Sequence, residues 1–136
     1  MAKQDRWRVL GALALIAVPL AAQNFDLEIA QGRALTPTAA QQIEASLTTS
    51  PDDLKARAKP LGFYAAQDPQ SRIARFRQIE WLMRNEPASK LLRDQTARLR
   101  QSDFAPPYDS YRDSLLEAWR EQVDRHPNNA VEFENA

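Results

Sequence analysis

The chain has 136 residues, 43% of them hydrophobic and 26% charged, and its 18 basic and 18 acidic side chains give a formal net charge of zero. This length allows one domain of ordinary size, and the composition excludes a disordered chain of low hydrophobicity and high charge. The balanced charge argues against nucleic acid as a partner. Because the sequence holds no cysteine and only three glycines, we expect a helical fold without disulfides.

Residues 1–22 have the pattern of a secretory signal. Three basic residues precede an uncharged apolar run at 9–22, which closes on small residues before polar Gln23. The alternative is an uncleaved membrane anchor, but a bilayer span takes about 20 apolar residues. We therefore expect cleavage after Ala22 and export to a periplasmic or extracellular location, with no stable membrane span in the mature chain.

After the leader, residues 23–35 lack a hydrophobic period and contain Gly32, so we expect a poorly ordered lead-in there. Residues 36–136 are expected to form an α-helical domain with helices over 37–47, 51–67, 69–85, about 91–99 and 108–125. A capping residue followed by proline marks three of the starts, at Thr36–Pro37, Ser50–Pro51 and Asp68–Pro69. Pro60 removes a hydrogen bond inside the second helix and is predicted to kink or split it.

Apolar stripes at helical spacing run along the two longest predicted helices. In the helix at 69–85 the stripe is formed by Ile73, Phe76, Ile79 and Met83. In the helix at 108–125 it is formed by Tyr108, Tyr111, Leu115, Trp119 and Val123. Each of these helices is therefore expected to bury one side.

The charges are unevenly distributed between the two halves of the helical domain. Residues 72–100 hold eight basic side chains against three acidic ones, whereas residues 101–136 hold eight acidic side chains against three basic ones. This asymmetry predicts that a basic helix and an acidic helix lie side by side. The alternative is that each helix meets a different partner.

A proline turn recurs along the sequence. Pro51, Pro87 and Pro127 are 36 and 40 residues apart, and each is followed by two small or polar residues. Apolar residues stand eight and four positions before each proline, namely Ile43 and Leu47, Ile79 and Met83, and Trp119 and Val123. A period of this size is typical of stacked helix–turn–helix units.

This pattern resembles the tetratricopeptide repeat. Tyr64 stands where such repeats place an aromatic residue, and "PLGFY" at 60–64 is similar to their Leu-Gly-x-x-Tyr signature. The resemblance covers about residues 40–136 and implies antiparallel helix pairs that stack into a short array and bind a peptide or partner helix in a groove. "RQIEWLMRNEP" followed by "EQVDRHPNNA" is also similar to exported bacterial proteins whose helical repeats continue further.

The stretch after Pro127 reads as the start of another helix, so the last repeat is expected to be incomplete. Because each repeat buries its apolar face only against its neighbours, Val131 and Phe133 are predicted to lack a full partner in the monomer. Either the chain is a fragment of a longer array, or the final helix is a truncated cap. In the second case, self-association through these two side chains would give a homo-oligomer.

The sequence offers no catalytic constellation. His126 is the only histidine, and without cysteine a zinc site would depend almost wholly on carboxylates. His126 is interpreted as a helix C-terminal residue, and the adjacent Asp52 and Asp53 as charges that favour a helix N-terminus. We therefore predict a protein that is not an enzyme and needs no cofactor or metal.

The candidate binding residues are aromatic and basic. Trp81 falls beside the apolar stripe of its helix with Arg77 and Arg84 around it, which would suit an acidic or aromatic peptide. Tyr64 joins them through the resemblance to tetratricopeptide repeats. Two hypotheses follow: an exported interaction module that presents a groove to another protein, or the N-terminal structural segment of a longer exported enzyme or envelope assembly.

Overall fold

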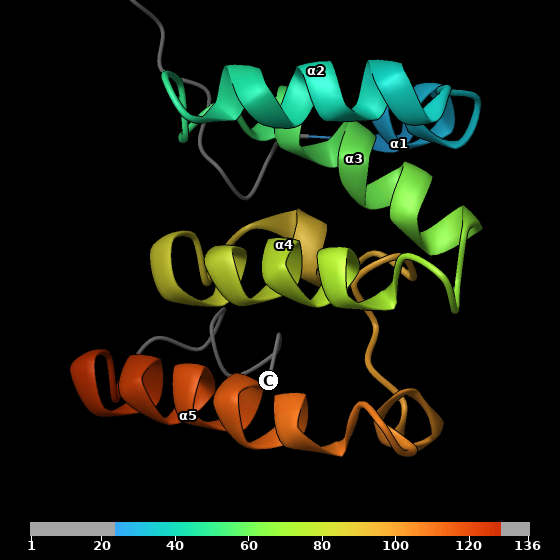
Figure 1. Cartoon of the computed structure of the whole chain (residues 1–136). Helices are drawn as coiled ribbons and strands as arrows, with labels where there is room; N and C mark the ends of the chain where they lie inside the picture. The colour runs from blue at the N-terminus through green and yellow to red at the C-terminus, as the bar shows by residue number, and fades with distance from the viewer. Residues whose placement is uncertain (1–23, 129–136) are drawn as a thin grey trace, which may run out of the picture.

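The computed structural model describes residues 24–128, which are helical and contain no strand (Figure 1). The helices are α1 (Asp26–Arg33), α2 (Pro37–Leu47), α3 (Leu54–Ala66), α4 (Arg72–Asn85) and α5 (Asp109–Arg125), with short 3-10 helices η2 (Lys90–Arg93) and η3 (Gln101–Phe104) between the last two. The expectation of an all-α fold is confirmed. Between residues 24 and 128, no helix combines the length and hydropathy that a bilayer crossing requires.

Helix α1 corrects the prediction of a poorly ordered lead-in. Phe25 and Ile29 are only 3% and 4% exposed, because α1 packs against α3. A Cβ atom at Gly32 would lie 2.0 Å from the Lys59 carbonyl oxygen, and one at Gly62 would lie 2.4 Å from the Ile29 carbonyl oxygen. Gly32, which weakens an isolated helix, therefore permits the close crossing that stabilises this one.

The start of α2 agrees with the prediction, whereas the start of α3 does not. The Thr36 hydroxyl accepts a hydrogen bond from the Ala39 amide at 3.2 Å. Helix α3 begins at Leu54 rather than at Pro51, because the Asp53 carboxylate caps it by accepting from the Ala56 amide. The helix continues through Pro60 without splitting and ends at Ala66.

Helix α4 ends at Asn85 as predicted, but it begins three residues after Pro69. Asp68 was expected to cap the helix. Its carboxylate instead accepts two hydrogen bonds of 2.8 Å from the Arg72 guanidinium. This pairing holds the pKa of Asp68 below its usual value.

The connection from α4 to α5 is not the helix predicted near 91–99. The Ser89 hydroxyl accepts from the Leu91 amide, and the Asp94 carboxylate accepts from both the amide and the hydroxyl of Thr96. These local bonds compete with helical hydrogen bonding. The segment therefore forms η2 and turns that pack Leu91 into the core.

Helices α2, α4 and α5 run in the same direction, and α3 runs against them (Figure 1). The parallel course of α4 and α5 is evident from Glu80, which accepts from Ser114, and from Arg84, which pairs with Glu121. The three parallel helices are those that end before Pro51, Pro87 and Pro127. In the second interval no long antiparallel helix exists, because the 3-10 turns of residues 86–108 take its place.

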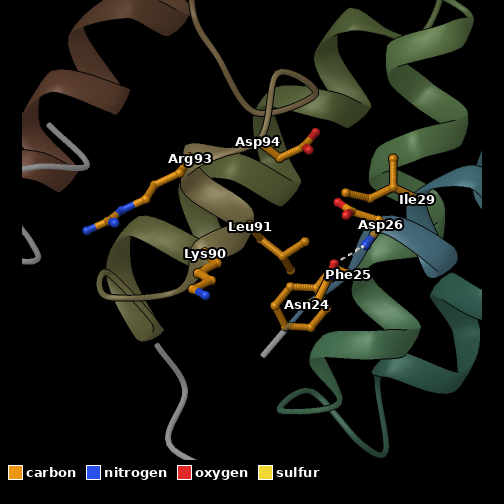
Figure 2. A pocket seen from close by; sticks show the side chains of 8 residues that line it. All are labelled: Asn24, Phe25, Asp26, Ile29, Lys90, Leu91, Arg93 and Asp94. Atoms are coloured by element: carbon orange, nitrogen blue, oxygen red, sulfur yellow. Dashed lines mark hydrogen bonds between the residues drawn. The ribbon is translucent and has the colours of Figure 1, made fainter. Parts of the chain in front are cut away.

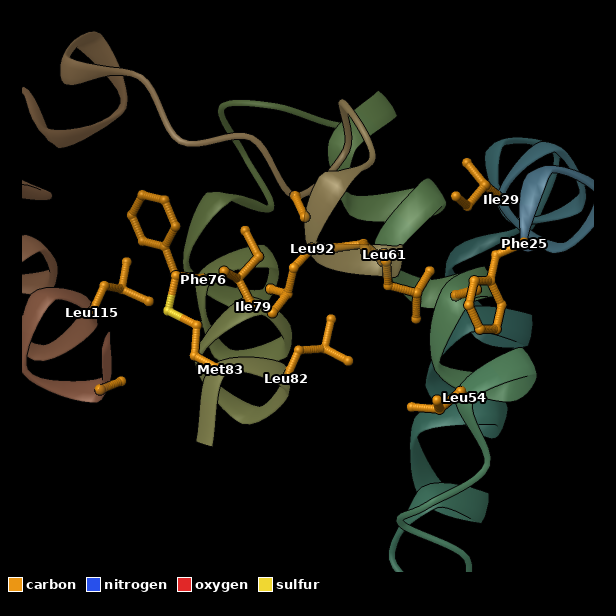
Figure 3. Close-up of a cluster of buried hydrophobic side chains, with 14 residues drawn as sticks. Phe25, Ile29, Leu54, Leu61, Phe76, Ile79, Leu82, Met83, Leu92 and Leu115 are labelled. Carbon is orange, nitrogen blue, oxygen red and sulfur yellow. The ribbon is translucent and has the colours of Figure 1, made fainter. Parts of the chain in front are cut away.

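The main hydrophobic core lies where α1, α3, α4, η2 and α5 converge (Figure 3). Its fully buried large side chains include Leu61, Phe76, Ile79, Leu82 and Leu91. Side chains from α4 lie at the centre of this core, with η2 and α1 on one side and α5 on the other. The predicted adjacency of the basic and acidic helices is confirmed, since α4 and α5 pack directly against each other.

Candidate partner-binding surface

One side of α4 remains accessible in the folded chain. Ile73, Arg77, Trp81 and Arg84 recur at intervals of three or four residues, so they share one side of the helix. Phe76, which belongs to the buried side, is 1% exposed. We call the accessible set, Ile73, Arg77, Trp81 and Arg84, the α4 face. Three of the four predicted binding residues thus lie together.

Ile73 was expected to be buried, but it is 37% exposed. The buried side of α4 is centred on Ile79 and Leu82, which are fully buried, and Ile73 lies outside that arc. The α4 face therefore offers an aliphatic side chain one turn before the exposed Arg77.

Trp81 is backed by a buried arginine from α3. The guanidinium carbon of Arg57 lies 3.5 Å from the centre of the Trp81 ring, which is a close cation–π contact. Arg57 is only 5% exposed. It donates to the Gln78 side-chain oxygen at 2.7 Å and to the Pro51 carbonyl at 2.8 Å. These bonds hold the cation under one side of the indole.

The charge of Arg57 is balanced at a distance rather than by a direct ion pair. Gln78, which accepts from Arg57, donates to the Glu44 carboxylate of α2 at 2.9 Å. Burial lowers the pKa of Arg57, and the carboxylates of Asp52 and Glu44 oppose that shift. The Arg57 Nε atom is buried without a hydrogen-bond partner among the described residues. The network joins three helices beneath the α4 face.

Arg84 lies at the α5 flank of the same face. Its guanidinium pairs with Glu80 on α4 at 3.1 Å and with Glu121 on α5. Glu80 also accepts from the Ser114 hydroxyl at 2.8 Å. These two carboxylates neutralise Arg84, and its side chain is therefore held between the helices.

Arg77 has no ion pair or side-chain hydrogen bond to other residues in the range 24–128, and it is exposed. It lies between Ile73 and Trp81 in the α4 face. A guanidinium in this setting can accept a carboxylate bidentately, while the neighbouring side chains supply apolar contact. The arrangement suits a ligand that carries an acidic group beside an apolar one.

Tyr64, the fourth predicted binding residue, lies apart from this surface. It is 7% exposed and belongs to a small separate cluster with Ala40 and Phe63. Burial, followed by a hydrogen bond to Glu44, raises the pKa of its phenol. Its role in the described structure is packing between α2 and α3.

Arg57 is the member of this site that sequence reasoning missed. Leu54, Ala58 and Leu61 are buried on α3 at spacings of four and three, and Arg57 falls within the same arc. A charged residue inside an apolar helical stripe requires a buried partner or an aromatic ring. That pattern was the available signal.

Glu86, at the C-terminal end of α4, makes a pH-dependent contribution to stability. Burial first, and then the carboxylate of Asp52, raises the pKa of Glu86. An acid whose pKa rises on folding destabilises the fold once it is ionised. The loss of stability is therefore absent at pH values below the ordinary pKa of 4.5, and it is complete at pH values above the pKa in the folded state.

We therefore expect Glu86→Gln to raise the denaturation midpoint at neutral pH, and this gain to vanish as the pH falls below 4.5. Urea titrations followed by circular dichroism across this pH range measure the effect. The exposed Glu117→Gln is the control. A gain that persists unchanged at low pH would contradict the assignment.

A separate surface, which is concave, lies between the start of α1 and η2, with a volume of about 300 Å³ (Figure 2). Phe25, Ile29 and Leu91 form its apolar floor, and the Asp26 amide donates to the Asn24 side chain at 2.9 Å. Its rim carries two basic and two acidic residues, namely Lys90, Arg93, Asp26 and Asp94. Since these charges balance and the apolar side chains are already buried, the α4 face is the stronger candidate.

Residues 24–128 contain no group of three or more metal-ligating side chains that could hold a metal ion. Val131 and Phe133, which were predicted to mediate self-association, lie outside the described residues.

Comparisons with protein-family models, with curated proteins and with solved structures gave no match to this chain. Function must therefore be inferred from the α4 face itself.

Proposed function

We propose that this chain is a non-catalytic helical module that binds a segment of another protein on the α4 face. The observation that carries the proposal is the grouping of exposed Ile73 and Arg77 with Trp81, whose other side is covered by the buried Arg57. Holding Arg57 with two hydrogen bonds fixes the indole before any ligand arrives. Such preorganisation lowers the entropic cost of binding.

The ligand in this proposal presents a carboxylate beside an aromatic or aliphatic side chain. An exposed ion pair contributes about 0.2–1 kcal/mol, and packing of an aromatic ligand side chain against Trp81 adds about 0.5–1.5 kcal/mol. Burial of the Ile73 side chain adds about 1–2 kcal/mol. These small terms fit a weak, reversible contact rather than a permanent complex.

The proposal includes export directed by residues 1–22. In this proposal, α2, α3 and α4 form a tetratricopeptide-like array. Each of these helices runs antiparallel to the one before it. The alternative, an N-terminal segment of a longer exported enzyme or envelope assembly, is favoured by Leu116, which is 41% exposed on the outer side of α5. An incompletely covered last helix is what a continuing array would leave.

A phage-displayed library of random short peptides, panned against the full chain, tests the proposal. We expect enriched peptides that place Asp or Glu beside an aromatic or aliphatic residue. Arg77→Glu should weaken their binding by up to about tenfold, because an attraction becomes a repulsion.

Arg112→Glu makes the same charge change on the exposed surface of α5, away from the α4 face, and serves as the matched control. Its binding should match that of the unmodified chain. Equal affinities of the two variants, or an absence of enriched peptides, would refute this function.

A further inference from the structure

The outer side of α5 carries an apolar hollow that is separate from the α4 face. The hollow has a volume of about 360 Å³ and is lined by Leu116, Trp119 and Val123, with Arg120 and Asp124 at its rim. We call this hollow the α5 groove. Its apolar side chains are spaced three and four residues apart, which is the spacing of the seam between two paired helices.

The α5 groove exists because the structure buries a different arc of α5 from the one that the sequence predicted. The sequence placed Trp119 and Val123 on the buried stripe of this helix. In the structure the buried positions are Leu115, Ala118 and Gln122, and the two predicted residues are only partly covered. An apolar seam therefore remains at the surface after the chain has folded.

We propose that a second copy of this chain covers the α5 groove, with the two α5 helices packed antiparallel about a two-fold axis. Helix α5 is outermost in the stack, with α4 on its inner side (Figure 1). It has 17 residues, so a second α5 can lie along several turns of it. Under two-fold symmetry, each contact from one copy is returned by the same residues of the other. The surface must therefore be complementary to itself.

The charges beside the α5 groove meet this requirement. Asp113 and Arg120 are exposed and are seven residues apart, so both lie along the same edge of the seam. Neither has an ion pair or a side-chain hydrogen bond to another residue of the described range 24–128. These two opposite charges are thus available to another molecule.

An antiparallel pairing of two α5 helices brings these charges together. When Leu116 of each copy faces Trp119 of the other, Asp113 of each copy comes beside Arg120 of the other, because the midpoints of the two residue pairs differ by only one position along the helix. Residues at the edge of a helix–helix seam form ion pairs of this kind. The dimer therefore gains two ion pairs while it covers the apolar seam of both copies.

This charge pattern favours a second copy over other occupants. A further repeat or an unrelated protein could also cover the apolar side chains of the α5 groove. Neither of them requires opposite charges at two positions that match each other under a two-fold axis, whereas a second copy does. A single pair of short helices belongs to the low end of interface sizes, below about 1,200 Å² in total, so we expect a weak and reversible dimer.

The dimer leaves the α4 face of both copies accessible. Glu121, which pairs with Arg84 at the edge of the α4 face, is five positions after Leu116. Five positions correspond to a rotation of about 140° around a helix. The α5 groove and the α4 face therefore lie on different flanks of α5, and the dimer does not depend on the function proposed above.

Sedimentation equilibrium of the full chain, expressed with its own leader, tests the proposal at protein concentrations from about 10 µM to about 1 mM. We expect the apparent mass to rise with concentration from one chain towards two. Asp113→Arg alone and Arg120→Asp alone should each weaken dimerisation about tenfold, because two attractions become two repulsions. The two substitutions combined should restore it, because the exchanged charges pair again.

Glu117→Arg is the matched control for the charge changes, since Glu117 is exposed but faces another side of α5. Its dimerisation should equal that of the unmodified chain. A mass of one chain at every concentration would overturn the proposal. A combined variant that dimerises no better than the single variants would overturn it as well.

A second pair of variants tests the apolar seam. Leu116→Glu places a charge at a position that is 41% exposed, and we expect this variant to have the mass of one chain throughout the concentration range. Leu27→Glu makes the same change on α1 at a position that is 65% exposed, and it should dimerise as the unmodified chain does. Equal dimerisation of the two variants would contradict the assignment. Circular dichroism of each variant shows that the helical fold is retained.

Discussion

Gly32→Ala is expected to lower the free energy of unfolding by about 3 kcal/mol. The added methyl group would lie 2.0 Å from the Lys59 carbonyl oxygen, and the nearest atoms are all backbone. A flexible side chain could move aside at little cost, but here α1 and α3 must separate. That separation would loosen the contacts of Phe25 and Ile29 with the core.

The expected sign is opposite to that of the same substitution at an ordinary helical glycine. In an exposed helix interior, replacing glycine with alanine stabilises by up to about 1 kcal/mol. Urea denaturation of Gly32→Ala should instead show a lower midpoint, and Gly62→Ala should do the same because its methyl group meets the Ile29 carbonyl at 2.4 Å. Gln31→Ala, at an exposed neighbouring position, is the control. A raised midpoint for Gly32→Ala would show that the helices do not cross closely.

Arg75→Met is expected to destabilise the fold by about 3 kcal/mol, because it leaves buried acceptors without a donor. Arg75 is 6% exposed and donates to the carbonyl oxygens of Thr96 and Arg98, each at 2.6 Å. Its guanidinium also lies 3.7 Å from the Asp103 carboxylate. These contacts attach the irregular connection to α4.

Hydrogen exchange and urea denaturation together measure the effect of Arg75→Met. Amides of residues 94–103 should lose protection first, since the substitution removes the side chain that satisfies this segment. Arg77→Met alters the same residue type two positions away on the exposed side of α4, and its stability should change by less than about 0.5 kcal/mol. Similar losses in the two variants would contradict a special role for the buried arginine.

The grouping of side chains on the α4 face was predictable in part, for a reason that lies in helical geometry. Arg77, Trp81 and Arg84 recur at intervals of four and three, so any helix over this region brings them to one side. The contact between Trp81 and a buried cation could not be predicted in this way. Arg57 lies 24 positions earlier in the chain, and only the packing of α3 against α4 brings its guanidinium to 3.5 Å from the indole. Tyr64 illustrates the converse, since its neighbours in space bury a residue that its position in a repeat suggested would bind.

The helical character of the chain and the end of α4 follow from local sequence, because propensity, capping and the position of proline act over a few residues. The sequence by itself determined α2 with its Thr36 cap, α4 up to Asn85 and α5 after the double proline at 106–107. Only the tertiary structure decided that residues 26–33 are helical and that the 86–108 connection replaces an antiparallel helix. In both cases the deciding contacts join residues more than 20 positions apart: Gly32 meets Lys59, and Arg75 meets Thr96. Local conformational preference does not predict such pairs, because they stabilise the fold only after the helices have packed.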